Sequence, residues 1–171
     1  MDSETTLPNY TYNDCDLELL LNTDNAPDFS LNGHSCIARV VNVHDGDTIT
    51  VLLKCLDKVY KFHVRLNDMD AYEITSKDPL IKELAIKGRQ RIIHLIQPNN
   101  SQHRELSSRK EIKEYFTTNK TIVYLECFKN DKYGRLLANV FTFHDMIDIG
   151  KVLITEGLAC EYHGKTKTLQ Q

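Results

Sequence analysis

The distribution of β-branched residues constrains the fold most strongly. Three short runs, CIARVVNV, TITVLLK and VYKFHVRLN, follow one another from Cys36, and an Asp-Gly step separates the first two. Such a step between apolar runs is a strong hairpin signal. In the third run Val64 and Leu66 alternate with Arg65, which places the arginine on the opposite face of the strand. The pattern predicts three consecutive strands.

Helical periodicity follows these strands. Asp78 is suited to cap a helix and Pro79 to its first turn, and an apolar stripe continues to Leu95. Ser108 and Glu111 have the spacing of a capping box, which predicts a second and shorter helix.

The remaining part of the chain predicts two more strands and one helix. The strands are expected at residues 122–128 and 136–142, and the helix is expected to begin near Asp145 or Asp148 and to end at Gly157. Five short strands interrupted by a helix after the third predict an α+β fold, a five-stranded OB-type Greek-key β-barrel with two to three helices. Several other small α+β folds fit the order nearly as well.

Charge divides the chain near residue 34. Residues 1–33 contain seven acidic residues and no lysine or arginine, whereas residues 34–171 contain 21 basic and 17 acidic residues. We therefore expect an acidic N-terminal extension, loop or disordered, over residues 1–33 and one folded domain over residues 34–171. Taken over the whole chain, the net charge of −3 argues against a nucleic-acid partner. The domain alone carries +4, so this argument does not apply to the domain. Residues 17–21 could form one turn of helix that docks on the domain; a free tail is the alternative.

Several features bear on the compartment. No apolar run is long enough to span a bilayer, and the first residues lack the basic start and apolar stretch of a signal peptide. Five cysteines, an odd number without a CxxC pair, favour free thiols in a reducing environment and disfavour zinc. We expect an intracellular, cytoplasmic and monomeric protein with no membrane partner.

Three charged stretches are candidates for chemistry. Asp47 follows the Asp-Gly step, Asp70 and Glu73 follow the third strand in an expected loop, and the sequence DKYGR joins the last two strands at residues 131–135. Crowded carboxylates repel one another unless a metal ion or an arginine neutralises them. Each stretch alone is also explained as a polar turn or a solvated acidic loop.

Taken together, the three stretches resemble the staphylococcal nuclease-like (thermonuclease) family. The resemblance runs from Ala38 to Ala159 and includes the DGDT hairpin, an arginine followed five residues later by Asp and eight residues later by Glu, and the DKYGR turn. The charged positions that carry it are Asp47, Arg65, Asp70, Glu73 and Arg135.

The resemblance implies a calcium-dependent nuclease that cleaves phosphodiester bonds of DNA and/or RNA and leaves 3′-phosphate ends. Calcium takes hard oxygen ligands, and the family implies the carboxylates of Asp47 and Asp70 and the backbone carbonyl of Ala71. Another divalent cation is the alternative to calcium. A non-catalytic nucleic-acid-binding or interaction module on the same fold is the alternative to a nuclease.

The resemblance also assigns roles to the other residues. Arg65 and Arg135 would bind the phosphate, because guanidinium groups match phosphate oxygens bidentately. Glu73 would orient and deprotonate the attacking water. The remaining candidates would bind the nucleotide, two through a terminal phosphate and two by stacking on a base: Lys132 and Tyr133, and Tyr162 and His163.

Overall fold

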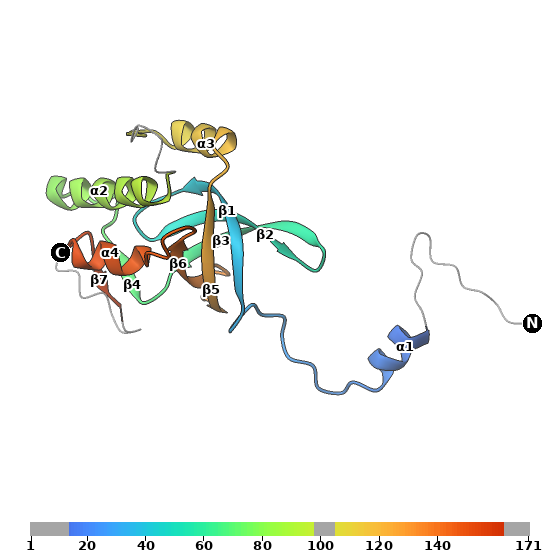
Figure 1. Cartoon of the computed structure of the whole chain (residues 1–171). Coiled ribbons are helices and arrows are strands. Elements are labelled where there is room, and N and C mark those ends of the chain that lie inside the picture. Colours follow the sequence, from blue (N-terminus) through green and yellow to red (C-terminus); the bar gives the residue numbers. More distant parts are fainter. Residues whose placement is uncertain (1–13, 98–104, 163–171) are drawn as a thin grey trace, which may run out of the picture.

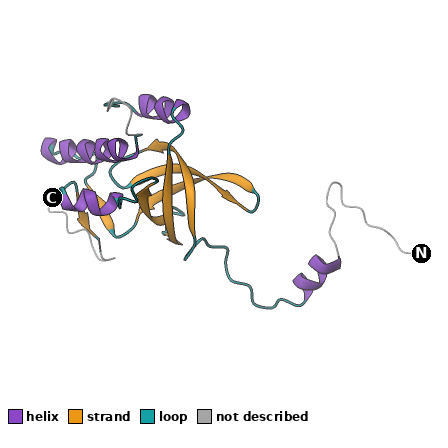
Figure 2. Cartoon of the chain, in the orientation of Figure 1, coloured by secondary structure: helices purple, strands orange, loops and turns teal. Residues whose placement is uncertain are grey.

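A closed β-barrel forms the centre of the protein (Figures 1 and 2). The computed structural model describes residues 14–97 and 105–162. Five strands form the barrel in the order β1-β2-β3-β6-β5, which confirms the predicted α+β fold with an OB-type barrel. The strands are β1 (Ser35–Val43), β2 (Thr48–Cys55), β3 (Lys58–Leu66), β5 (Ile122–Asn130) and β6 (Leu136–Thr142).

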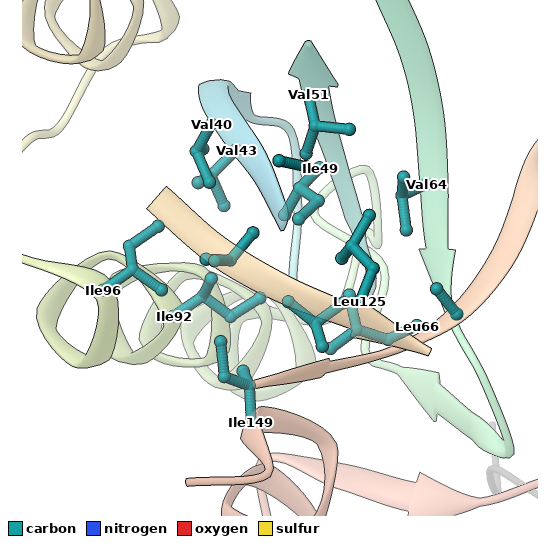
Figure 3. Close-up of a cluster of buried hydrophobic side chains, with 14 of the residues drawn as sticks. Val40, Val43, Ile49, Val51, Val64, Leu66, Ile92, Ile96, Leu125 and Ile149 are labelled. Atoms are coloured by element: carbon teal, nitrogen blue, oxygen red, sulfur yellow. The ribbon is translucent and has the colours of Figure 1, made fainter. Parts of the chain in front are cut away.

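Strand pairing closes the barrel and fills it with alternating apolar side chains. β1 pairs antiparallel with both β2 and β5, and β3 pairs parallel with β6. Because side chains alternate between the faces of a strand, Val51, Val64 and Leu125 point inward, where each is fully buried (Figure 3). Arg65 lies on the outer face between Val64 and Leu66, as the alternation predicts.

Within the described residues, the helices α2, α3 and α4 pack beside the barrel (Figure 1). The N-cap residues Asp78 and Ser108 accept backbone N–H groups as the sequence predicts, and Ser108 and Glu111 form a complete capping box. Ile92 and Ile149 belong to the same buried cluster as the barrel residues (Figure 3). The helices are α2 (Pro79–Ile96), α3 (Arg109–Thr118) and α4 (Ile149–Thr155).

A small second sheet was missed by the sequence analysis. β4 (Met69–Ala71) pairs antiparallel with β7 (Ala159–Glu161). Asp70 was expected in a loop, but it is the central residue of β4 and is only 6% exposed. The pairing fixes its backbone, and with it the direction of its carboxylate.

The described part of the acidic segment, residues 14–33, contains one helix. α1 (Asp14–Leu21) is longer than the single turn expected there. It lies apart from the barrel in Figure 1, and Leu20 and Leu21 are more than 70% exposed. Of the two possibilities for residues 17–21, a free tail and docking on the domain, docking is therefore not observed. In the described ranges, no helix is both long enough and apolar enough to cross a membrane.

Candidate functional site

Arg65 connects two buried carboxylates from different parts of the chain. It projects from the outer face of β3, where its Nη1 contacts Asp47 Oδ2 at 2.5 Å and its Nη2 contacts Asp70 Oδ1 at 2.6 Å. Its Nη2 also donates to the backbone carbonyl of Met69. Asp47 comes from the β1–β2 turn and Asp70 from β4. The structure therefore brings together three predicted site residues that lie as many as 23 positions apart in the sequence.

Burial sets the electrostatics of this group. Asp47 is 7% exposed, and burial together with the nearby Asp45 raises its pKa more than Arg65 and Thr48 lower it. For Arg65, burial favours the neutral form, but Asp47 and Asp70 outweigh that effect and raise its pKa. The arginine is therefore held as a cation, and it offsets part of the negative charge of two carboxylates that would otherwise be more costly to bury.

The second arginine is positioned by its own turn. The Nε of Arg135 contacts Asp131 Oδ2 at 2.7 Å, while Asp131 Oδ1 accepts the backbone N–H groups of Tyr133 and Arg135. Gly134 closes the turn at a φ of +82°, a conformation that glycine adopts without a steric penalty. Partial burial alone would raise the pKa of Asp131, but the hydrogen bonds from Arg135 and Tyr133 outweigh it and lower the pKa.

A hydroxyl group links the two arginines. Thr48 donates its Oγ1 hydrogen to Asp47 Oδ1 at 2.7 Å and accepts from Arg135 Nη1 at 3.4 Å. Asp47 in turn contacts Arg65. Thr48 also pairs directly with Arg65 across β2 and β3, so the barrel itself fixes the separation of the two guanidinium groups.

An open pocket of about 760 Å³ lies against these groups. Its walls include Glu73, which is exposed just after β4, and Tyr133, which is 73% exposed. The Nζ of Lys132 lies 5.1 Å from the ring centroid of Tyr133, and Arg135 also lies over this ring. Of the predicted site residues, the pocket is lined by Arg65, Asp70, Glu73, Lys132, Tyr133, Arg135 and Tyr162.

The C-terminal aromatic candidates are only partly described. Tyr162 follows β7 directly, and its backbone N–H donates to the carbonyl of Asp68 at 2.9 Å. This bond holds the tyrosine at the rim of the pocket. His163 lies outside the described residues.

One of the candidate metal ligands has an oxygen atom without a hydrogen bond. Asp70 Oδ2 is buried and accepts no hydrogen bond, which is a costly state for a carboxylate oxygen. An unpaired carboxylate oxygen of this kind fits a hard cation such as Ca²⁺, whereas both oxygens of Asp47 already have partners in Thr48 and Arg65. Ala71, whose carbonyl is the third candidate, is buried next to Asp70. Within residues 14–97 and 105–162, no cluster of three or more His, Cys, Asp or Glu side chains is placed to hold a metal ion, so any cation bound here needs backbone or water ligands as well.

Sequence reasoning missed three residues that position the site. It gave no role to Thr48 or Asp131, although each lies within a motif that it singled out, and cross-strand pairing of Thr48 with Arg65 could have been derived from the hairpin register. Gly46 was explained by the turn alone. A Cβ atom at Gly46 would lie 2.8 Å from the Ala71 side chain, so glycine is needed there for close packing of the β1–β2 turn against β4.

A comparison with models of protein families identifies the family of the chain. The model of the staphylococcal nuclease homologues matches residues 63–171, more than half of the chain. The matched region contains both arginines, Asp70 and Glu73, whereas Asp47 lies before it in sequence and reaches it through the contact with Arg65. No curated protein was found to match the chain. The chain belongs to the staphylococcal nuclease homologue family.

Proposed function

We propose that this protein is a metal-dependent nuclease, with Ca²⁺ as its cation, that hydrolyses phosphodiester bonds of DNA and/or RNA to 3′-phosphate ends. One observation carries the proposal: two positioned arginines, an exposed glutamate and a buried carboxylate with an unfilled oxygen all face one open pocket. A site built only to bind a nucleic acid needs the cations, but it has no need of Glu73 or of the buried acid pair.

The two arginines bind and polarise the phosphate. A guanidinium group has five N–H donors in a fixed plane, more than the three contacts that Arg65 makes with Asp47, Asp70 and Met69. Negative charge grows on the phosphate oxygens in the transition state, so donors that are already in place stabilise it more than the ground state. Loss of one such donor costs on the order of 10²–10³ in rate.

Glu73 acts as the general base. It follows β4 by two residues, so the same short sheet that fixes Asp70 also fixes the start of the segment that carries the glutamate. Its carboxylate lines the pocket with both arginines. From this position it orients a water molecule toward the phosphorus and takes the proton of that water as the bond to phosphorus forms.

The bound nucleotide is held at the rim of the pocket. Lys132 and Tyr133 contact a second, terminal phosphate, and the exposed ring of Tyr162 offers a face on which a base stacks. Stacking on an aromatic side chain contributes about 1–3 kcal/mol per base. Such contacts accept every base, which favours cleavage without strong sequence preference.

The carboxylates of Asp47 and Asp70 and the carbonyl of Ala71 would hold the cation. When bound, it supplies positive charge to the phosphate oxygens and lowers the pKa of a coordinated water. The acid pair carries two negative charges against the single positive charge of Arg65. The excess favours a cation at this position.

The test measures cleavage of end-labelled single-stranded DNA and RNA with Ca²⁺, with Mg²⁺ or with a chelator. We expect cleavage with Ca²⁺, its loss with the chelator, and products that become substrates for a 3′-specific phosphatase. Cleavage that is unaffected by the chelator would refute the metal dependence. Binding without cleavage under every condition would show that the chain is instead a non-catalytic nucleic-acid-binding module.

A further inference from the structure

Two cysteines lie side by side on neighbouring strands of the barrel and do not line the pocket of the proposed site. Cys36 on β1 and Cys127 on β5 have their Sγ atoms 4.0 Å apart, and both are free thiols. Cys36 is opposite Leu125, while the N–H of Cys127 donates to the carbonyl of His34. The two cysteines are therefore diagonal neighbours on one face of an antiparallel pair, where side chains are close enough to interact.

The two thiols differ in accessibility and in acidity. Cys36 is partly exposed, whereas Cys127 is 2% exposed. The hydrogen bond from Cys127 lowers the pKa of Cys36 to about 7, and the same bond raises the pKa of Cys127. Near neutral pH about half of Cys36 is thus thiolate, while Cys127 stays a thiol, and the thiolate is the reactive form of cysteine.

We propose that Cys36 and Cys127 form an oxidisable pair, which hydrogen peroxide converts into a disulfide between β1 and β5. The Cys36 thiolate attacks one oxygen of peroxide, the O–O bond breaks, and the departing hydroxide takes a proton to leave as water. The sulfur of Cys127 then attacks the sulfenic acid of Cys36, the S–O bond breaks, and a second water leaves with the thiol proton. Two electrons pass from the two sulfurs to one peroxide.

The structure needs little rearrangement for this bond. The sulfurs must close from 4.0 Å to the usual 2.05 Å. Diagonal neighbours have Cα atoms about 7–8 Å apart, so the side chains must rotate and the two strands must also approach by about 1 Å. Cys127 is also a fixed point, because its carbonyl accepts the N–H of Gly33 while its N–H binds His34. The disulfide would join the start of β1 to β5, just before the irregular register between Cys127 and Asn130 that leads into the Asp131 turn.

The expected consequence is a more stable barrel. The two cysteines are 91 positions apart in sequence, so the bond would close a long loop in the unfolded chain. Such a cross-link lowers the entropy of the unfolded chain. For a domain of this size we expect oxidation to raise Tm by roughly 5–15 °C.

The experiment treats the full chain with one equivalent of hydrogen peroxide, alkylates the remaining thiols and maps the peptides without reduction. We expect a cross-linked peptide pair containing Cys36 and Cys127, in a protein that stays the size of a single chain, and a higher Tm that returns to its first value on reduction. The same treatment of Cys36→Ser should give no cross-link and no rise in Tm.

Cys55→Ser is the matched control, because Cys55 is a half-buried cysteine on the neighbouring strand β2. This variant should form the cross-link as the wild type does. The proposal would be overturned if Cys127 were alkylated in full after oxidation, or if Cys36 were recovered as a sulfinic acid or linked mainly to the exposed Cys15. Neither readout depends on nuclease activity, so the outcome is independent of the proposed function.

Discussion

The two arginines of the pocket are anchored in different ways. Arg65 is 17% exposed and bridges two carboxylates that come from separate elements, the β1–β2 turn and β4. Arg135 is 28% exposed and is anchored by Asp131, four residues before it in the same turn. The first arginine is held by tertiary structure and the second by a local motif.

This difference separates stability from catalysis at the two positions. Asp47 and Asp70 are both buried, so the charge of Arg65 is needed whether or not a substrate is bound. The Asp131 side chain is 14% exposed, and it accepts the backbone N–H groups of Tyr133 and Arg135 in addition to the Arg135 guanidinium. We therefore expect changes at Arg65 to affect folding and activity together, and changes at Arg135 to affect mainly activity.

The largest effect is expected for Arg65→Met. The variant should lose at least 10²-fold in kcat/KM and about 3 kcal/mol in the free energy of unfolding, because two buried carboxylates would lose their cation. Chemical denaturation at pH 7 and a cleavage assay measure the two effects. Arg91→Met is the matched control, since its ion pair with Glu156 is at the surface and should contribute less than about 1 kcal/mol. Unchanged stability of Arg65→Met would contradict the proposed role of this charge.

Arg135→Lys should lower activity without lowering stability. Lysine keeps the charge but loses the planar fork that matches a phosphate, so we expect a fall of about 10² in kcat/KM and a change in unfolding free energy below about 1 kcal/mol. Steady-state kinetics and denaturation on one preparation provide both values. A loss of stability as large as that of Arg65→Met would remove the distinction between the two arginines.

Asp131→Asn tests the anchor of the second arginine. Poorer alignment of Arg135 should lower kcat/KM by about tenfold. The pKa of Asp131 is lowered from its usual 3.8 in the folded state, so its ionised form stabilises the fold above that pH, and this contribution is lost as the pH falls through the lower value. The difference in Tm between wild type and variant should therefore be constant from pH 7 to about 5 and should decrease below about pH 4. A difference in Tm that grows on acidification would contradict a lowered pKa of Asp131 in the folded state.

The smallest effect is expected for Thr48→Val. The change keeps the shape of the side chain but removes the hydroxyl between Asp47 and Arg135. Loss of these hydrogen bonds corresponds to about 1 kcal/mol, or about fivefold in kcat/KM. In a double-mutant cycle with Arg135→Lys the effects should be non-additive, because both changes act on the same contact. Strict additivity would show that the hydroxyl does not couple the two arginines.

Local signals explain why much of the fold could be predicted. The alternation around Arg65, the cap at Asp78 and the capping box of Ser108 depend on neighbours within a few residues, and the structure confirms all three. The pairing of Met69–Ala71 with Ala159–Glu161 could not be predicted in the same way, because each strand has only three residues and the two are about 90 positions apart. Short strands of this kind form through tertiary contact and not through a local pattern.

The same limit applies to the candidate site. Charge and spacing singled out Arg65, Asp70 and Arg135, but the sequence does not show that Arg65 contacts both acids at once. It also does not show that Asp70 keeps a buried oxygen without a hydrogen bond. Both features arise where a hairpin turn, a barrel strand and a two-stranded sheet meet, and no single segment carries them.

The most direct test of the proposed mechanism is the initial rate of oligonucleotide cleavage by Glu73→Gln at saturating Ca²⁺. Glu83→Gln, which changes an exposed glutamate of α2 paired with Lys87, is the matched control. We predict that Glu73→Gln retains the wild-type Tm and binds the oligonucleotide, but loses at least 10²-fold in rate, while Glu83→Gln cleaves at the wild-type rate. Equal rates for Glu73→Gln and the wild type would contradict the assignment of Glu73 as the general base, and with it the proposed mechanism.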